Sequence, residues 1–153
     1  MPAPEGRCPM TKARASVLFL LALALAACEA NPHSSAGFSL PQGDAERGKA
    51  VFVELKCTAC HRVQGLDDLP APVIEPPVPV ILGGEVPHVR TDGELMTSII
   101  NPSHKIAPGY PLNEVKRGEE SRMIDYSDVM TVRQMIDLVA FLQSRYTVIR
   151  PGK

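Results

Sequence analysis

Tryptophan is absent from this sequence of 153 residues, and aromatic residues of all kinds make up only 5% of it. A domain of this size with so few bulky side chains has little material for a hydrophobic core. An excess of basic residues is also lacking, since 16 lysines and arginines are balanced by 17 aspartates and glutamates. Nucleic-acid binding, which needs a basic surface, is therefore not expected. Strand-like alternation of apolar and polar residues is nearly absent, which disfavours a sheet-based fold.

Cysteine is scarce, and its four positions, 8, 28, 57 and 60, leave no framework of disulfides for a small secreted domain. The first lies within residues 1–27, where basic residues precede the apolar run "ASVLFLLALALAA". That run is too short to span a membrane comfortably and has the layout of a secretory signal peptide. Its removal would take away three basic residues and one acidic residue, which changes the net charge from −1 to about −3.

The end of this run, "LAAC" at residues 25–28, resembles the bacterial lipobox, in which the cysteine is acylated and becomes the first residue of the mature protein. We therefore expect residues 1–27 to be a lipoprotein signal peptide and Cys28 to carry lipid. Residues 28–43 are small, polar and interrupted by proline, which predicts a flexible membrane tether. An ordinary signal peptide cut nearby would instead leave Cys28 as a free thiol, a reactive group in an exported protein. The expected location is the periplasmic face of a bacterial membrane.

The segment "KCTACHRV", residues 56–63, brings two cysteines and a histidine together, and three kinds of site use such residues. A thioredoxin-type dithiol would place C-x-x-C at the start of a helix in a strand-rich fold, whereas these cysteines follow a predicted helix. A structural zinc site needs four ligands, and the other histidines are scattered singly. Covalent haem attachment uses both thiols and the adjacent histidine. Cys57, Cys60 and His61 are therefore predicted to hold one haem c, whose porphyrin would also supply the missing core material.

Three helices are predicted along the chain. The first begins at a cap on Asp44 and ends near Leu55, directly before the cysteine motif. The second begins at the capping-box pattern of residues 91–94 and ends before Pro102. The third, over about residues 132–145, has the clearest apolar periodicity and follows a second capping box.

Residues 69–87 contain six prolines, which exclude a helix and a central strand. An ordered, extended loop is expected there, lying on an apolar surface that covers its valines and isoleucines. Residues 101–111 are also expected to form a loop, and residues 147–153 a frayed tail.

The stretches "GDAERGKAVFVELKCTACHRVQG" and "SRMIDYSDVMTVRQMIDLVAFLQS" resemble the two ends of a bacterial class I cytochrome c, a likeness that covers about residues 43–146. The resemblance implies an all-α, cytochrome c-like helical fold around one covalently bound haem c, in a domain of residues 44–146. It also implies a tight crossing of the first and last helices. Gly48 and Phe52 would lie on one side of this crossing, and residues 139–141 on the other.

The same resemblance implies a methionine as the second protein ligand of the iron, in the loop before the last helix. Met123 lies eight residues before the Thr131 cap, as is usual in the family, but Ile124 stands where the family commonly has proline. Met130 is the next candidate. Two further methionines fall on predicted helices and are interpreted as core residues: Met96 and Met135.

Two histidines, His88 and His104, could give bis-histidine ligation but are interpreted as surface loop residues. The second ring nitrogen of His61 needs a hydrogen-bond acceptor, which in the family is a backbone carbonyl near a proline. Pro79 is the candidate for that position.

Iron with a protein ligand on each face has no open position for a substrate, so neither enzymatic activity nor a small-molecule substrate is expected. The sequence predicts a membrane-anchored electron carrier that passes single electrons between redox protein partners, such as respiratory enzymes or dehydrogenases. A haem c subunit of a larger oxidoreductase complex is the main alternative. A haem sensor or peroxidase would require that Met123 does not bind iron.

Overall fold

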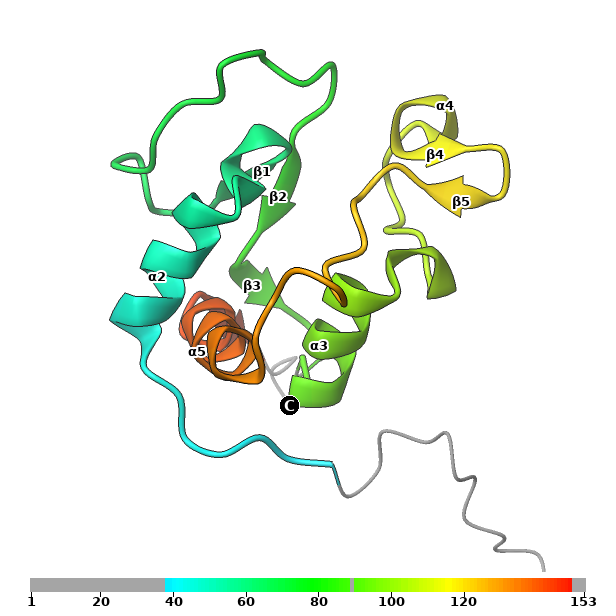
Figure 1. Ribbon diagram of the computed structural model, residues 1–153. Helices are drawn as coiled ribbons and strands as arrows, with labels where there is room; N and C mark the ends of the chain where they lie inside the picture. The colour runs from blue at the N-terminus through cyan, green and yellow to red at the C-terminus, as the bar shows by residue number, and fades with distance from the viewer. Residues whose placement is uncertain (1–37, 89, 150–153) are drawn as a thin grey trace, which may run out of the picture. The chain divides into compact units, whose positions relative to one another are not determined.

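The computed structural model describes residues 38–88 and 90–149 (Figure 1). The expected signal peptide, the expected lipidation site Cys28 and most of the expected tether lie outside the described residues. Within those two ranges, no helix combines the length and the apolar character needed to cross a membrane.

The helices are α2 (Ala45–Glu54), α3 (Asp92–Ile100), α4 (Leu112–Val115) and α5 (Val132–Gln143). The three predicted helices are confirmed as α2, α3 and α5, together with their caps. The Asp44 carboxylate accepts from the backbone N–H groups of Glu46 and Arg47, and capping boxes open α3 and α5. The single turn of α4 was not expected.

The crossing of α2 and α5 is as tight as the resemblance implied. A Cβ added at Gly48 would collide with the backbone carbonyl of Asp137 and would lie 2.7 Å from the Cβ atom of Phe141. One turn of α2 after Gly48, the ring of Phe52 contacts the ring of Phe141, with their centroids 5.6 Å apart and their planes inclined at 57°. The helix backbones approach so closely only because position 48 carries no side chain.

A buried carboxylate stabilises the same crossing through hydrogen bonds. Asp137, on α5, is only 2% exposed. It accepts a hydrogen bond of 2.8 Å from the Arg47 Nε atom and another of 2.8 Å from the backbone N–H of Asp44. The hydrogen-bonded Arg47 guanidinium holds the pKa of Asp137 below its usual range. This stabilisation is therefore present at neutral pH and is lost as the pH falls below the usual carboxylate range.

The hydrophobic core lies where α2, α3 and α5 converge. Its fully buried side chains are Phe52, Leu138 and Val139. Helix α3 contributes two further members, Leu95 and Ile99, and β1 contributes Val63. Several half-buried residues of the cysteine motif and of the loop before α5 pack against this core: Leu55, Cys57, Met123, Tyr126 and Met130.

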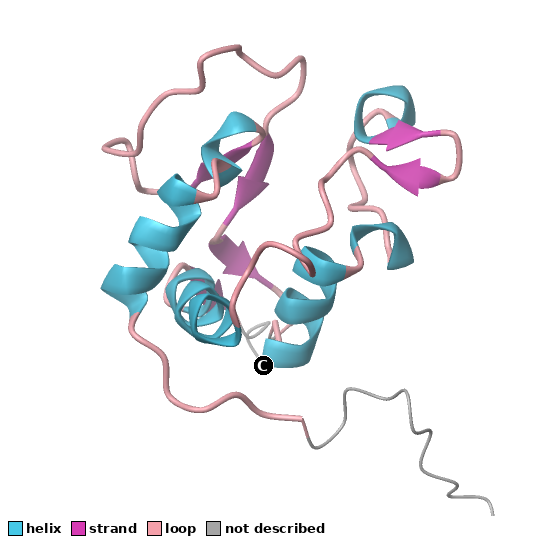
Figure 2. Ribbon diagram, viewed as in Figure 1, coloured by secondary structure: helices cyan, strands magenta, loops and turns pink. Residues whose placement is uncertain are grey.

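Three short strand pairs accompany the helices, which the sequence did not predict (Figure 2). β1 (His61–Val63) pairs in parallel with β2 (Val80–Leu82), and β3 (Gly84–Val86) pairs in parallel with β6 (Tyr146–Val148). β4 (Lys116–Arg117) and β5 (Glu120–Ser121) form an antiparallel hairpin. Residues 147 and 148, expected in a frayed tail, thus belong to a strand.

The proline-rich segment, residues 69–87, differs from its predicted structure in two ways. Its last third is not loop but carries β2 and β3, which are possible because Pro79 and Pro87 stand just outside them and each pair has only two strands. Its first part does not lie on an apolar surface, since Val73 and Ile74 are 103% and 82% exposed.

Replacing Gly48 by alanine should destabilise the fold. The helix propensity of alanine would favour the variant by about 1 kcal/mol. The collision with the rigid carbonyl of Asp137 costs more, and we expect a net loss of about 1–3 kcal/mol. Chemical denaturation followed by far-ultraviolet circular dichroism measures it. Ala50→Gly, at an exposed position of the same helix, is the control for propensity alone. A Gly48→Ala protein as stable as the parent would contradict the close crossing.

Candidate haem-binding site

The cysteine motif leaves the end of α2 through a sharp reversal of the backbone. The N–H of Lys56 donates to the carbonyl of Val53, and Lys56 itself takes the left-handed conformation, with φ at 56°. A short 3-10 turn over Cys57–Ala59 follows, and β1 begins at His61. The crossing that fixes α2 therefore also fixes where the two thiols and the imidazole emerge.

The two thiols differ in environment and are not joined in a disulfide. Cys60 is exposed, whereas Cys57 is half-buried against the core. Burial raises the pKa of the Cys57 thiol to about 11, although its own backbone and the nearby Tyr126 hydroxyl act in the opposite direction. A thiol with so high a pKa is protonated at neutral pH and is a poor attacking group. This environment does not suit a dithiol redox centre.

His61 is held by the pairing of β1 with β2, in which His61 stands opposite Val80. The ring Nδ1 atom is shielded from solvent and has no hydrogen-bond partner. Burial lowers the pKa of His61, and the backbone of Val80 offsets part of that effect. The imidazole is therefore neutral at physiological pH, the form that binds a metal. The backbone group that raises the pKa of the ring belongs to Val80. Val80 is one residue after Pro79, the candidate that the sequence suggested for the acceptor position.

The four methionines considered as iron ligands occupy two kinds of position. Met96 and Met135 lie on α3 and α5 and pack in or against the core, as expected. Met123 and Met130 lie in the loop between β5 and α5, and both are half-buried against the same core as Cys57. The structure thus brings the two loop methionines and the first cysteine to one cluster of apolar side chains.

The remaining histidines with described positions stand at the surface. His88 and His104 are both exposed, and Nδ1 of His104 lies 2.8 Å from the carbonyl oxygen of Asn101. No group of three or more His, Cys, Asp or Glu side chains within residues 38–88 and 90–149 is arranged to hold a metal ion. This part of the chain therefore offers no further ligands for a zinc ion at the cysteine motif.

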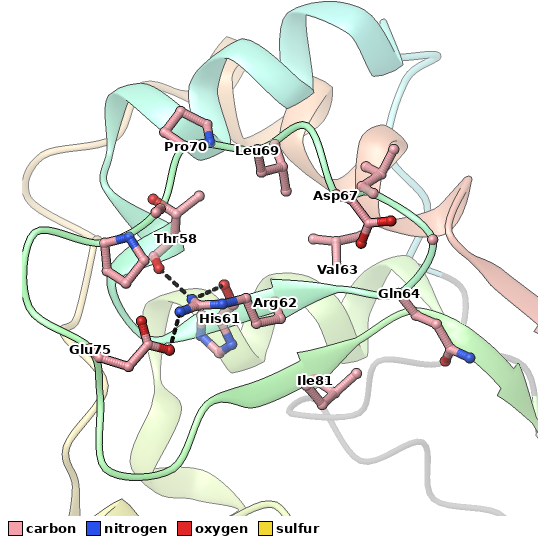
Figure 3. Close-up of a pocket in the computed structure, with 14 residues that line it drawn as sticks. Thr58, His61, Arg62, Val63, Gln64, Asp67, Leu69, Pro70, Glu75 and Ile81 are labelled. Carbon is pink, nitrogen blue, oxygen red and sulfur yellow. Dashed lines mark hydrogen bonds and ion pairs between the residues drawn. The ribbon is translucent and has the colours of Figure 1, made fainter.

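A cavity of about 560 Å³ lies beside the motif, under the proline-rich segment (Figure 3). Thr58, His61 and Arg62 line it on one side, and residues 69–72 on the other. Arg62 and Glu75 both line it and form an ion pair of 2.6 Å, and Arg62 also donates a hydrogen bond of 2.9 Å to the carbonyl of Thr58. The ion pair thus ties the segment to β1 at Glu75, directly after its two most exposed apolar residues, Val73 and Ile74.

Tyr126 is a residue of the site that the sequence analysis missed. Its hydroxyl donates a hydrogen bond of 3.0 Å to the backbone carbonyl of Leu55, which ends α2 two residues before Cys57. The signal was a lone aromatic residue between Met123 and the Thr131 cap, in a chain with few aromatic residues. Its partner is a backbone atom far away in the sequence, which no local pattern reveals.

The donor set fits a covalently attached haem. Both cysteines are free, as thioether formation requires, and the neutral His61 ring suits iron. The Nδ1 atom of His61 is shielded and unpartnered, and the backbone of Val80, opposite His61 in the strand pair, already acts on the pKa of the ring. A backbone acceptor for the second ring nitrogen is what a ligand histidine normally has.

Comparison with known proteins agrees with this arrangement. The family model described as Cytochrome c matches residues 45–145, from the first residue of α2 to just beyond the end of α5. Neither the curated proteins nor the solved structures contain a significant match to the chain. The family match spans about two thirds of the sequence and includes the whole cysteine motif, so the chain belongs to the cytochrome c family.

Proposed function

We propose that this protein is a monohaem c-type cytochrome that carries single electrons at the periplasmic face of a bacterial membrane, to which a lipid on Cys28 anchors it. The observation that carries the proposal is the C-x-x-C-H motif, with two free thiols and a half-buried imidazole that follow directly after the end of α2. Membership of the cytochrome c family supports the electron-carrier role and the covalent haem c.

Each residue of the site has a distinct task in this proposal. Cys57 and Cys60 would hold the haem through two thioether bonds, and His61 and Met123 would be the protein ligands of its iron. The bound haem would supply a one-electron couple. Two protein ligands would leave the iron no position for a substrate, and a thioether ligand would favour the ferrous state. The protein therefore exchanges electrons with redox protein partners and is not an enzyme by itself.

Met123 is preferred to Met130 because of their neighbours along the chain. Met130 directly precedes the Thr131 cap, and its N–H donates to the carbonyl of Tyr126 in the turn that leads into α5. The family commonly has a packing residue at that position. Met123 lies further from the helix, between the β4–β5 hairpin and this turn, at the spacing from the cap that the family uses for the ligand.

A haem c subunit of a larger oxidoreductase complex is the second candidate function. It is favoured by Val73 and Ile74, two consecutive apolar side chains that are almost wholly exposed beside the Arg62–Glu75 ion pair. Neighbouring apolar side chains at the surface, next to charged ones, are typical of a contact with another protein. Purification in mild detergent distinguishes the two functions, because a subunit would be recovered in a stoichiometric complex and a carrier alone.

Covalent attachment is tested with protein expressed together with a cytochrome c maturation system. The haem should stay with the polypeptide through denaturation and acid–acetone extraction, because thioether bonds survive both treatments. The variant with Cys57→Ala and Cys60→Ala should lose all covalent haem, whereas Cys28→Ser should retain it. Clean extraction of haem from the unaltered protein would overturn the central assignment.

The lipid anchor is tested by intact-mass measurement of the membrane fraction. The mature chain should begin at Cys28 and carry the additional mass of acyl groups, because "LAAC" follows the apolar run. Cys28→Ser should release soluble haem protein. Cys8→Ser is the matched control and should change nothing, because residue 8 would be removed with the signal peptide. An unmodified N-terminus at another residue would contradict the anchor.

The second iron ligand is tested by replacing each loop methionine with alanine. Met123→Ala should abolish the weak charge-transfer band in the red that a methionine gives with ferric haem. It should also open the iron to cyanide and lower the reduction potential. Met130→Ala should keep the band and lose no more than about 2 kcal/mol of stability, since its side chain is half-buried. The reverse pair of results would move the ligand to Met130.

A further inference from the structure

The loop that carries Met123 lacks the usual source of rigidity. Proline commonly follows the ligand methionine in this family, and its ring fixes one backbone angle. Here Ile124 follows instead, and it is 65% exposed, so packing of its side chain contributes little. The position of Met123 therefore depends on other contacts of the loop.

Two serines hold the N-terminal side of this loop. The Oγ atom of Ser121 accepts a hydrogen bond of 3.1 Å from the N–H of Met123. The N–H of Ser121 in turn donates to the Oγ atom of Ser103, at 3.0 Å. This chain of contacts ties Met123 to the segment that follows α3.

Tyr126 holds the C-terminal side with its backbone and its side chain. Its carbonyl oxygen accepts from the N–H groups of Val129 and Met130, at 3.2 and 3.1 Å, which closes the turn before α5. Its hydroxyl reaches across the molecule to the carbonyl of Leu55, at 3.0 Å. Tyr126 thus joins the loop of Met123 to the end of the helix that delivers Cys57.

The acceptor of this bond is a group that needs a partner. The last carbonyls of a helix have no donor within the helix, and Leu55 is the cap residue of α2. Removing the Tyr126 hydroxyl would leave that half-buried carbonyl without the partner it has here. The bond therefore acts on both ends: it caps α2 and it anchors the loop.

We propose that Tyr126 is a positioning residue for the iron's second ligand: its hydrogen bond to Leu55 holds the Met123 loop closed over the haem in place of the missing proline. The inference rests on the proposed function, in which Met123 binds iron. Tyr126 does not touch iron in this arrangement. It raises the fraction of molecules in which the methionine is bound.

The test uses the ferric holoprotein with Tyr126→Phe, and imidazole as a competing iron ligand. Imidazole binds only when the methionine has left the iron, so its apparent affinity reports the open fraction. Loss of one hydrogen bond should raise that affinity about five- to tenfold. Tyr146→Phe is the matched control, because Tyr146 also packs against the core, and it should leave the imidazole affinity unchanged.

Denaturant unfolding of both variants measures how much stability each has lost. A change in imidazole affinity can then be compared with the loss of stability, which distinguishes a positioning role from general destabilisation. If Tyr126→Phe raises the imidazole affinity no more than Tyr146→Phe does, the proposal is overturned. Failure of the proposed function gives a different result: Met123→Ala would then keep the red charge-transfer band, whatever Tyr126→Phe does. Should Tyr126→Phe yield no holoprotein, the double variant Ile124→Pro, Tyr126→Phe is made. If the double variant is recovered as holoprotein and shows the band, the proposal is supported. If no holoprotein with the band is recovered, the proposal is contradicted.

Discussion

The close crossing of α2 and α5 at Gly48 is the contact on which the rest of the structure depends. It sets the end of α2, and Cys57 follows that end by two residues. It also sets the start of α5, where the loop that carries Met123 must arrive. Asp137 adds a charged fastening at the same place, bound to Arg47 and to the first turn of α2. The positions of both faces of the proposed haem site therefore depend on one pair of helices.

The hydrogen bond from Tyr126 to Leu55 supplies a second connection between these two faces. The helix crossing places the ends of the segments, but the loop from Met123 to Thr131 could still move as a unit. A bond from the middle of that loop to Leu55, two residues before Cys57, restricts this movement. The serine contacts at Ser121 do the same on the other side of Met123. Together they account for an ordered loop without a proline after the methionine.

The features that the sequence predicted are those encoded by neighbouring residues. Capping residues and apolar periodicity gave the three main helices, and the C-x-x-C-H motif gave the candidate haem site. The strand pairs β1 with β2 and β3 with β6 were not predictable, because each is a pairing of three residues whose stability comes from a distant partner. The exposure of Val73 and Ile74 was missed for a related reason. Their hydrophobicity implied burial, but burial requires an apolar surface from elsewhere in the chain beneath them, and the local sequence does not determine whether one lies there.

The same distinction separates the two sides of the proposed iron site. Cys57, Cys60 and His61 lie within five residues, so local backbone geometry brings them together and a short motif identifies them. The proposed second ligand, Met123, lies in a loop that Tyr126 ties to Leu55, and only the folded chain brings Tyr126 and Leu55 together. Substitutions in the motif should therefore remove the haem. Substitutions in the long-range contacts should leave the haem attached and change the fraction of molecules in which the second ligand is bound to the iron. In the proposed holoprotein, the reduction potential and the ligand affinity of the iron would thus depend on the whole helix arrangement, and haem attachment would depend on the motif.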